Sequence, residues 1–159
     1  MGTSPNPSKR LWRFDGCRHR PSHPTLDGMS TTATRKPTKS AANRTALREA
    51  VAALNEGRHE DYLALFDPEA RLHGFQAGIA DVEDLVRFHA ATADTYPDAT
   101  VTLDDAIAER DRVASRFTWR ATQGPGTSLV AHGGAIMRFA DGQIVECWNL
   151  PTELRAVAA

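Results

Sequence analysis

Apolar and polar residues alternate through most of the second half of the chain, as they do in half-buried β-strands. Short polar or glycine-rich stretches, such as Gly124-Pro125-Gly126, interrupt the alternation and favour turns. The pattern therefore predicts four successive antiparallel strands, over residues 100–109, 113–123, 129–139 and 143–150.

Helical spacing replaces this alternation in the middle of the chain. A first helix is predicted to begin at Asn43 or Thr45 and to end at Gly57. A short second helix is expected over residues 59–66, because Tyr62, Leu65 and Phe66 lie at helical spacing before Pro68.

A short strand and a third helix complete the predicted elements. The strand covers residues 71–75, and Asp81 is expected to cap a helix that ends near residue 95. The apolar face of this helix is predicted to consist of Val82, Leu85, Val86, His89 and Ala93.

Together these elements predict an α+β fold. Three N-terminal helices would pack on the concave face of a bent, mostly antiparallel sheet, which gives a cone-shaped α+β barrel. The domain is expected to span residues 43–154, with residues 155–159 as a C-terminal tail.

Charge and composition separate the N-terminal segment from this domain. Residues 1–40 carry a net charge of +6 and are rich in Pro, Ser, Thr and Arg, whereas the remaining residues carry −7. Such a segment buries too little apolar surface to offset its ordering entropy, so residues 1–42 are predicted to be a disordered basic tail. Met29 is an alternative start of the protein.

Several function classes are disfavoured by the same observations. The acidic domain would repel nucleic acid, and no apolar run is long enough for a signal peptide or a membrane span. Two cysteines, Cys17 and Cys147, make no disulfide framework, so we expect a cytoplasmic protein.

The last hairpin predicts a pocket. If Ala140-Asp141-Gly142 forms a three-residue loop, then Ala135 lies opposite Cys147, and Gly133 lies opposite Asn149. The small residues would leave a hollow on the inner face of the sheet. Its expected walls, which would contact a substrate, are Phe66, Phe117, Trp119, Gly133, Ala135 and Cys147.

The opposite face of the sheet is expected to be apolar. It would carry Ile136, Ile144, Trp148 and Leu150, a patch that a second copy of the chain could cover. We therefore expect a homodimer with Ile136, Trp148 and Leu150 at its interface. A register shift of one residue would exchange the two faces.

Three polar residues are candidates for catalysis in the pocket. His89 is the best general acid or base by residue type, although a histidine bonded to a carbonyl at the core edge is an alternative. Tyr62 and Asn149 could hold a developing oxyanion, or could instead serve packing and a backbone hydrogen bond. His73 and His132 are expected to point outward, and no metal-ligand spacing is present.

The strand region resembles a known family. The Tyr96-Pro97-Asp98 turn, Asp111-Arg112-Val113, and the final hairpin sequence RFADGQIVECW are similar to the SnoaL-like polyketide cyclases. This family belongs to the superfamily built on the nuclear transport factor two fold, and the resemblance covers about residues 45–152. It implies the fold described above and dimerisation through the outer sheet face.

The resemblance does not carry over its catalytic residues. Thr152 stands where SnoaL-like cyclases have an aspartate, and Ala50, Gly74 and Ala135 stand where ketosteroid isomerases have acid-base groups. Glu146 matches the glutamate of the family's last motif. We expect its side chain to point outward and to form a structural ion pair. Cys147 is expected to be buried and not nucleophilic.

The function expected from this sequence is therefore a cofactor-free enzyme. It would act on a hydrophobic carbonyl or polyketide-like molecule, by cyclisation, isomerisation or dehydration through acid-base catalysis. The alternative is a non-catalytic ligand-binding or protein-interaction module on the same fold.

Overall fold

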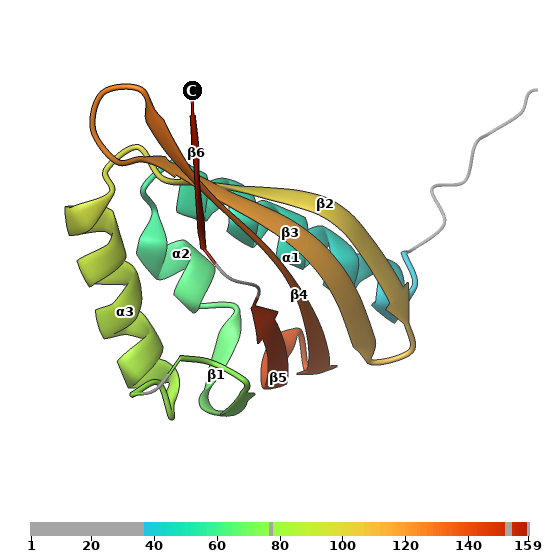
Figure 1. Cartoon of the computed structure of the whole chain (residues 1–159). Helices are drawn as coiled ribbons and strands as arrows, with labels where there is room; N and C mark the ends of the chain where they lie inside the picture. The colour runs from blue at the N-terminus through green and yellow to red at the C-terminus, as the bar shows by residue number, and fades with distance from the viewer. Residues whose placement is uncertain (1–36, 77, 152–153, 159) are drawn as a thin grey trace, which may run out of the picture. The chain divides into compact units, whose positions relative to one another are not determined.

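The computed structural model of the protein describes residues 37–76, 78–151 and 154–158. In this part of the chain, helices and strands follow one another in a mixed α+β arrangement (Figure 1). The elements are α1 Lys39–Asn55, α2 His59–Leu63, β1 Phe66–His73, α3 Val82–Thr95, β2 Thr100–Glu109, β3 Arg112–Thr122, β4 Thr127–Ala140, β5 Gln143–Pro151 and β6 Arg155–Ala158.

Helix α1 begins more than one turn earlier than predicted. Thr38 is its N-cap, and the Thr38 hydroxyl accepts a hydrogen bond from the backbone N–H of Ala41. The predicted start at Asn43 or Thr45 was therefore wrong, because a capping threonine lies further upstream. The tail was predicted over residues 1–42; its residues 39–42 belong to α1, whereas residues 1–36, with the alternative start at Met29, lie outside the described residues.

Helix α2 is shorter than predicted. It ends at Leu63, and Phe66 begins strand β1 instead of closing the helix. The predicted strand over residues 71–75 thus overlaps only the end of a longer one, and Gly74 and Phe75 lie beyond it. Strand β1 pairs in parallel with β5, which places Leu72 beside Cys147.

Helix α3 confirms the predicted cap at Asp81, whose carboxylate accepts from the backbone N–H of Asp84. Leu85 is fully buried on its inner face, but Val86 is 42% exposed. The predicted place of Val86 on the inner stripe was wrong. Phe88 lies there instead, one turn from Leu85 and beside His89.

The sheet has the strand order β1-β5-β4-β3-β2, with β6 paired to β4. In Figure 1 the long strands β2, β3 and β4 bend over the helices, and α1 lies beneath β2 and β3. Strands β1 and β2 form the two edges of this path, so the sheet is curved but unclosed. The predicted barrel is accordingly an open one.

In the β4–β5 hairpin the residue pairs differ from the predicted ones, but Ala135 and Cys147 still face the inner side of the sheet. Asp141 and Gly142, both at positive φ, form a two-residue turn, and a bulge follows between Arg138 and Phe139. The shorter turn and the extra residue each shift the pairing by one. Ala135 therefore lies opposite Asn149 rather than Cys147, and Gly133 lies opposite Pro151.

The bulge also turns Ile144 inward. Ile144 is fully buried in the core and Cys147 faces the same side, which regular alternation would not allow. The prediction that Ile144 lies on the outer face was wrong for this reason.

Beyond β5, residues 155–158 form strand β6 and pair with Thr127–Val130 of β4. The expectation of a C-terminal tail over residues 155–159 was therefore wrong for this stretch. Thr152 lies outside the described residues. None of the helices in the described ranges is long and apolar enough to cross a membrane.

Candidate functional site

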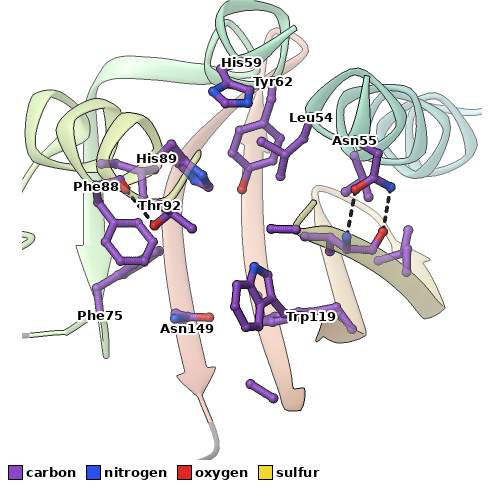
Figure 2. A pocket seen from close by; sticks show the side chains of 18 of the residues that line it. Leu54, Asn55, His59, Tyr62, Phe75, Phe88, His89, Thr92, Trp119 and Asn149 are labelled. Carbon is purple, nitrogen blue, oxygen red and sulfur yellow. Dashed lines mark hydrogen bonds between the residues drawn. The ribbon is translucent and has the colours of Figure 1, made fainter. Parts of the chain in front are cut away.

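A cavity of about 780 Å³ lies between the helices and the concave face of the sheet. Helices α1, α2 and α3 supply one wall, and β2 to β5 supply the other. Figure 2 shows Tyr62 and His89 on the helical side and Trp119 and Asn149 on the strand side, with their side chains directed toward the same space.

No Asp, Glu, Lys or Arg is present among the described residues that line this cavity. Its walls are mostly aliphatic and aromatic, with a few histidine, tyrosine and amide groups. A charged ligand would lose its hydration here without gaining an ion pair from these residues. The cavity therefore suits a neutral, largely apolar molecule.

Tyr62 and His89 meet at the junction of α2 and α3. Their ring centroids are 5.0 Å apart and the rings are nearly perpendicular, while Phe66 and Phe88 each pack edge-on against one of them. The aromatic contacts fix both rings by packing. Within the described part of the chain, neither the Tyr62 hydroxyl nor the His89 ring makes a hydrogen bond.

Burial keeps His89 neutral. It is the larger cause that lowers the pKa of His89 to about 4, and like charge on the nearby His59 is the smaller cause. Burial also raises the pKa of Tyr62 above its ordinary value, with a smaller contribution from Cys147. At neutral pH the site thus offers an uncharged imidazole, which can accept a proton, beside a phenol, which can donate a hydrogen bond.

Asn149 faces the cavity from β5, and a close backbone contact holds it there. Gly74 has a φ of +70°, and a Cβ atom at this position would lie 2.1 Å from the Asn149 carbonyl oxygen. The end of β1 therefore packs directly on the backbone of Asn149. The Asn149 amide makes no hydrogen bond to any described residue, which leaves it available to a ligand.

Most of the residues predicted to form the apolar walls do line the cavity. Phe66, Phe117, Trp119, Ala135 and Cys147 all line the cavity, and Tyr96 packs edge-on against Trp119. Gly133 does not line it. The ring of Phe117 lies over Gly133, where a Cβ atom would meet the ring at 2.4 Å. Burial raises the pKa of Cys147 to about 12, which disfavours a thiolate nucleophile.

The sequence analysis missed several cavity residues. Phe88 was overlooked because the neighbouring Val86 was assigned to the inner stripe. Its spacing from Leu85 and Thr92 is the signal that could have found it. Figure 2 also shows His59, Leu54 and Phe75 around the cavity, from α2, α1 and the segment after β1.

Two polar cavity residues serve the structure. The Asn55 side chain donates to the Val101 carbonyl at 2.8 Å and accepts from the Val101 N–H at 2.7 Å, which joins α1 to β2. The Thr92 hydroxyl donates to the Phe88 carbonyl (Figure 2). These groups are already satisfied, unlike Tyr62 and Asn149.

The outer sheet face carries a different set of residues. His73 stacks on Trp148 with centroids 5.2 Å apart, and the Arg112 guanidinium lies 5.5 Å from the Trp148 ring. Glu146 accepts from Arg138 at 3.2 Å and contacts His73 at 3.1 Å, which confirms its outward ion pair. Both partners lower the pKa of Glu146, with His73 the larger cause.

A row of outward residues crosses five neighbouring strands. Pairing places them side by side from β2 to β1, as Ile107, Ala114, Ile136, Trp148 and His73. Ile107 is 73% exposed and Ile136 39% exposed. No group of three or more His, Cys, Asp or Glu among the described residues is placed to hold a metal ion.

Comparison with known proteins identifies the family of the chain. Its closely similar solved folds include AclR, a candidate hydroxylase from Streptomyces galilaeus, with 24% identity and a TM-score of 0.62 over 71% of this chain and 90% of AclR. TsrD from Streptomyces laurentii is 25% identical, with a TM-score of 0.60 over 74% of this chain and 91% of TsrD. IdmH, a candidate polyketide cyclase from Streptomyces antibioticus, is 24% identical, with a TM-score of 0.58 over 72% and 92%.

The chain has no match among curated protein sequences. The family model described as SnoaL-like domain, in contrast, matches residues 47–147, which is more than half of the chain. The cavity, the curved open sheet and this match agree, and the protein therefore belongs to the SnoaL-like domain family.

Proposed function

We propose that this protein is a cofactor-free enzyme that acts on a neutral, hydrophobic carbonyl or polyketide-like molecule. The reaction would be a cyclisation, an isomerisation or a dehydration driven by acid-base catalysis. One observation carries this proposal: a neutral imidazole, a phenol and an unbonded amide face one uncharged, apolar cavity.

His89 is the proposed proton carrier. An enolisable carbonyl compound loses a proton from the carbon next to the carbonyl, and the lone pair of a neutral imidazole can accept it. Burial of His89 supports this role because it keeps the ring unprotonated over the physiological pH range.

Tyr62 and Asn149 are the proposed oxyanion donors. As the proton leaves, negative charge develops on the carbonyl oxygen, and a phenol O–H and an amide N–H can each donate a hydrogen bond to it. The raised pKa of Tyr62 favours the protonated donor form. Such hydrogen bonds strengthen in the transition state, where the charge is greatest.

The apolar walls would orient the rest of the substrate. Trp119 and Phe117 on β3, with Phe88 on α3, offer flat surfaces on both sides of the cavity. Held between them, a substrate would present its carbonyl to the polar groups, and this positioning supplies part of the rate enhancement. The names of two solved structures fit this class of chemistry, those of IdmH and of a candidate ketosteroid isomerase from Kribbella flavida.

We also propose that the protein forms a homodimer through the row of Ile107, Ile136 and Trp148, with Leu150 beside it. Leu150 is 60% exposed, and the row continues across the sheet. The alternative is a non-catalytic function on the same fold. The cavity could hold its ligand without turnover, or this outer face could recruit another protein.

The test starts from the natural ligand. Small molecules that co-purify with the protein are released by denaturation, identified by mass spectrometry and returned to the wild type and to His89→Gln. The proposal expects the wild type to convert the molecule, or its biosynthetic precursor, and the variant to bind it with little conversion. Binding without conversion by the wild type would favour the non-catalytic alternative.

A further inference from the structure

The outer face of the sheet carries a second row of side chains beside the outer row described above. Each of its members lies two residues along its strand from a member of the outer row, and therefore on the same face. Read from β1 through β5, β4 and β3 to β2, this charged row consists of Arg71, Glu146, Arg138, Arg112 and Glu109.

Contacts and exposure place the charged row at the surface. The Arg112 guanidinium lies 5.5 Å from the ring of Trp148, which belongs to the outer row. The two ends of the charged row, Arg71 and Glu109, are exposed on the edge strands β1 and β2. A partner that covers the outer row therefore also meets these charges.

The order of charges along this row is almost complementary to its own reverse. Read from β1 to β2, the signs are plus, minus, plus, plus and minus. The reversed row reads minus, plus, plus, minus and plus, so every position except the central Arg138 meets the opposite sign. A surface that complements its own reversed copy can form an isologous contact between two identical chains.

Two aligned arrangements are available to sheets that stack face to face about a two-fold axis. An axis along the outer row keeps the strand order, so that Trp148 would face Trp148 and Ile107 would face Ile107 of the second copy. An axis parallel to β4 reverses the strand order and places the charged row against its own reverse. The charges therefore favour the axis parallel to β4.

Side-chain size in the outer row favours the same axis. With the strand order reversed, the large ring of Trp148 on β5 faces Ala114 on β3 of the second copy, the smallest residue of the row. His73 then faces Ile107, and Ile136 faces its own copy. Ile107 is 73% exposed and Ile136 is 39% exposed, so this contact removes apolar surface from water.

We propose that two copies of this chain associate through their outer faces about a two-fold axis parallel to β4 at Ile136. Arg71 of one copy then faces Glu109 of the second copy, and Glu146 faces Arg112. This inference rests on the homodimer proposed above and assigns the residues that meet in it. Exposed charge pairs add little affinity, but they fix the register of an interface because the wrong register brings like charges together.

Charge reversal tests the pairing of the two edge strands. Arg71 and Glu109 lie at opposite edges of the sheet in one chain, so they can meet only between copies. Arg71→Glu and Glu109→Arg should each weaken the dimer several-fold at low salt, because like charges then meet twice per dimer. An equimolar mixture of the two variants should prefer the heterodimer in native mass spectrometry, since it has opposite charges at both contacts. A mixture of Arg71→Glu with Glu49→Arg, a reversal on α1, should show no preference.

Chemical cross-linking tests the axis independently. Single cysteines are introduced in a Cys17→Ser background, in which the remaining Cys147 is buried, and are treated with a short bis-maleimide. Ile136→Cys should link to its own copy. Ile107→Cys should not, because its copies are displaced by four strand spacings, about 19 Å. It should link instead to His73→Cys when the two variants are mixed.

The outcomes separate this inference from the proposals on which it rests. A link between two copies of Ile107→Cys, or a charge-reversed mixture without preference for the heterodimer, overturns this arrangement and leaves the homodimer standing. A wild type that sediments as a monomer at micromolar concentration overturns the homodimer and this inference together, but leaves the chemistry proposed for the cavity standing.

Discussion

The two faces of the sheet are built from the same strands but satisfy their polar groups differently. On the outer face the charged side chains are paired, as in Arg116 with Asp104 and Asp105 and in Glu146 with Arg138. On the inner face charged residues are absent from the described cavity lining, and Tyr62 and Asn149 make no hydrogen bond to described residues.

This difference shows where a ligand is expected. Ligand sites commonly place a few polar groups on otherwise apolar walls, where these groups can bond to the bound molecule. The outer face satisfies itself with ion pairs, which add little stability in water. On the inner face Tyr62 and Asn149 have no hydrogen-bond partner among the described residues, which supports the proposals that the cavity binds a ligand and that the outer face serves assembly.

The largest effect is expected from removal of the inner histidine. His89→Ala should lower the turnover of a converted substrate by about 10²- to 10⁴-fold while the substrate still binds, because the proton acceptor is lost but the apolar walls remain. Steady-state rates and separate binding titrations measure the two effects. The control is His73→Ala on the outer face, and an equal loss of rate there would remove the distinction between the faces.

A charged side chain in the outer row of Ile107, Ile136 and Trp148 should prevent formation of the homodimer. Trp148→Arg would place a third arginine near Arg112 and Arg138 and remove the ring on which His73 stacks, at a cost of several kcal/mol to a dimer. Analytical ultracentrifugation should show dimers for the wild type and monomers for the variant. Val86→Arg, at an exposed site on α3, should stay dimeric. A monomeric wild type at micromolar concentration would contradict the dimer.

A smaller effect is expected where β1 touches Asn149. Gly74→Ala brings a Cβ atom against the Asn149 carbonyl oxygen, whereas Gly78→Ala meets nothing within 4 Å at a similar positive φ. Both variants carry the same kind of backbone strain. Gly74→Ala should therefore be less stable by about 1 to 3 kcal/mol in urea unfolding. Equal stability would show that Gly74 does not position Asn149.

The pH dependence of stability should reveal the buried imidazole. The pKa of His89 is about 4 in the folded protein and near 6.5 when the chain is unfolded, so the unfolded chain binds more protons between these values. Its contribution to stability is complete above about pH 6.5 and declines as the pH falls toward 4, by at most about 1.4 kcal/mol per pH unit.

Urea unfolding of the wild type and of His89→Gln at several pH values measures this contribution by difference. The carboxylates that titrate at lower pH are common to both proteins and cancel. Parallel stability curves for the two proteins would mean that His89 is solvated and not held neutral by burial.

Much of the fold was predictable because alternation and capping are local signals. Strand β2 and the cap at Asp81 agree with their predicted positions. The faces of β4 and β5 were also predicted correctly, although two errors cancelled: the turn is one residue shorter, and a bulge adds one residue. Ile144, beside that bulge, was the residue for which alternation failed.

The site was less predictable because it depends on contacts between distant elements. Tyr62 and His89 were proposed from their helical faces, but their ring contact depends on how α2 packs on α3. The exclusion of Gly133 by the Phe117 ring follows from a rotamer that the sequence does not encode locally.

The most direct test of the cavity uses the neutral fluorescent probe N-phenyl-1-naphthylamine. Its affinity is measured for the wild type and for Ala135→Leu. Ala135 lines the cavity from β4, so a leucine there should fill open space. The account predicts one probe molecule bound per wild-type chain, at least tenfold weaker binding to Ala135→Leu, and a free energy of unfolding that is unchanged or higher. A loss of about 1 to 3 kcal/mol in Ala135→Leu, together with no probe bound by the wild type, is the result of overpacking a filled core and would contradict the cavity.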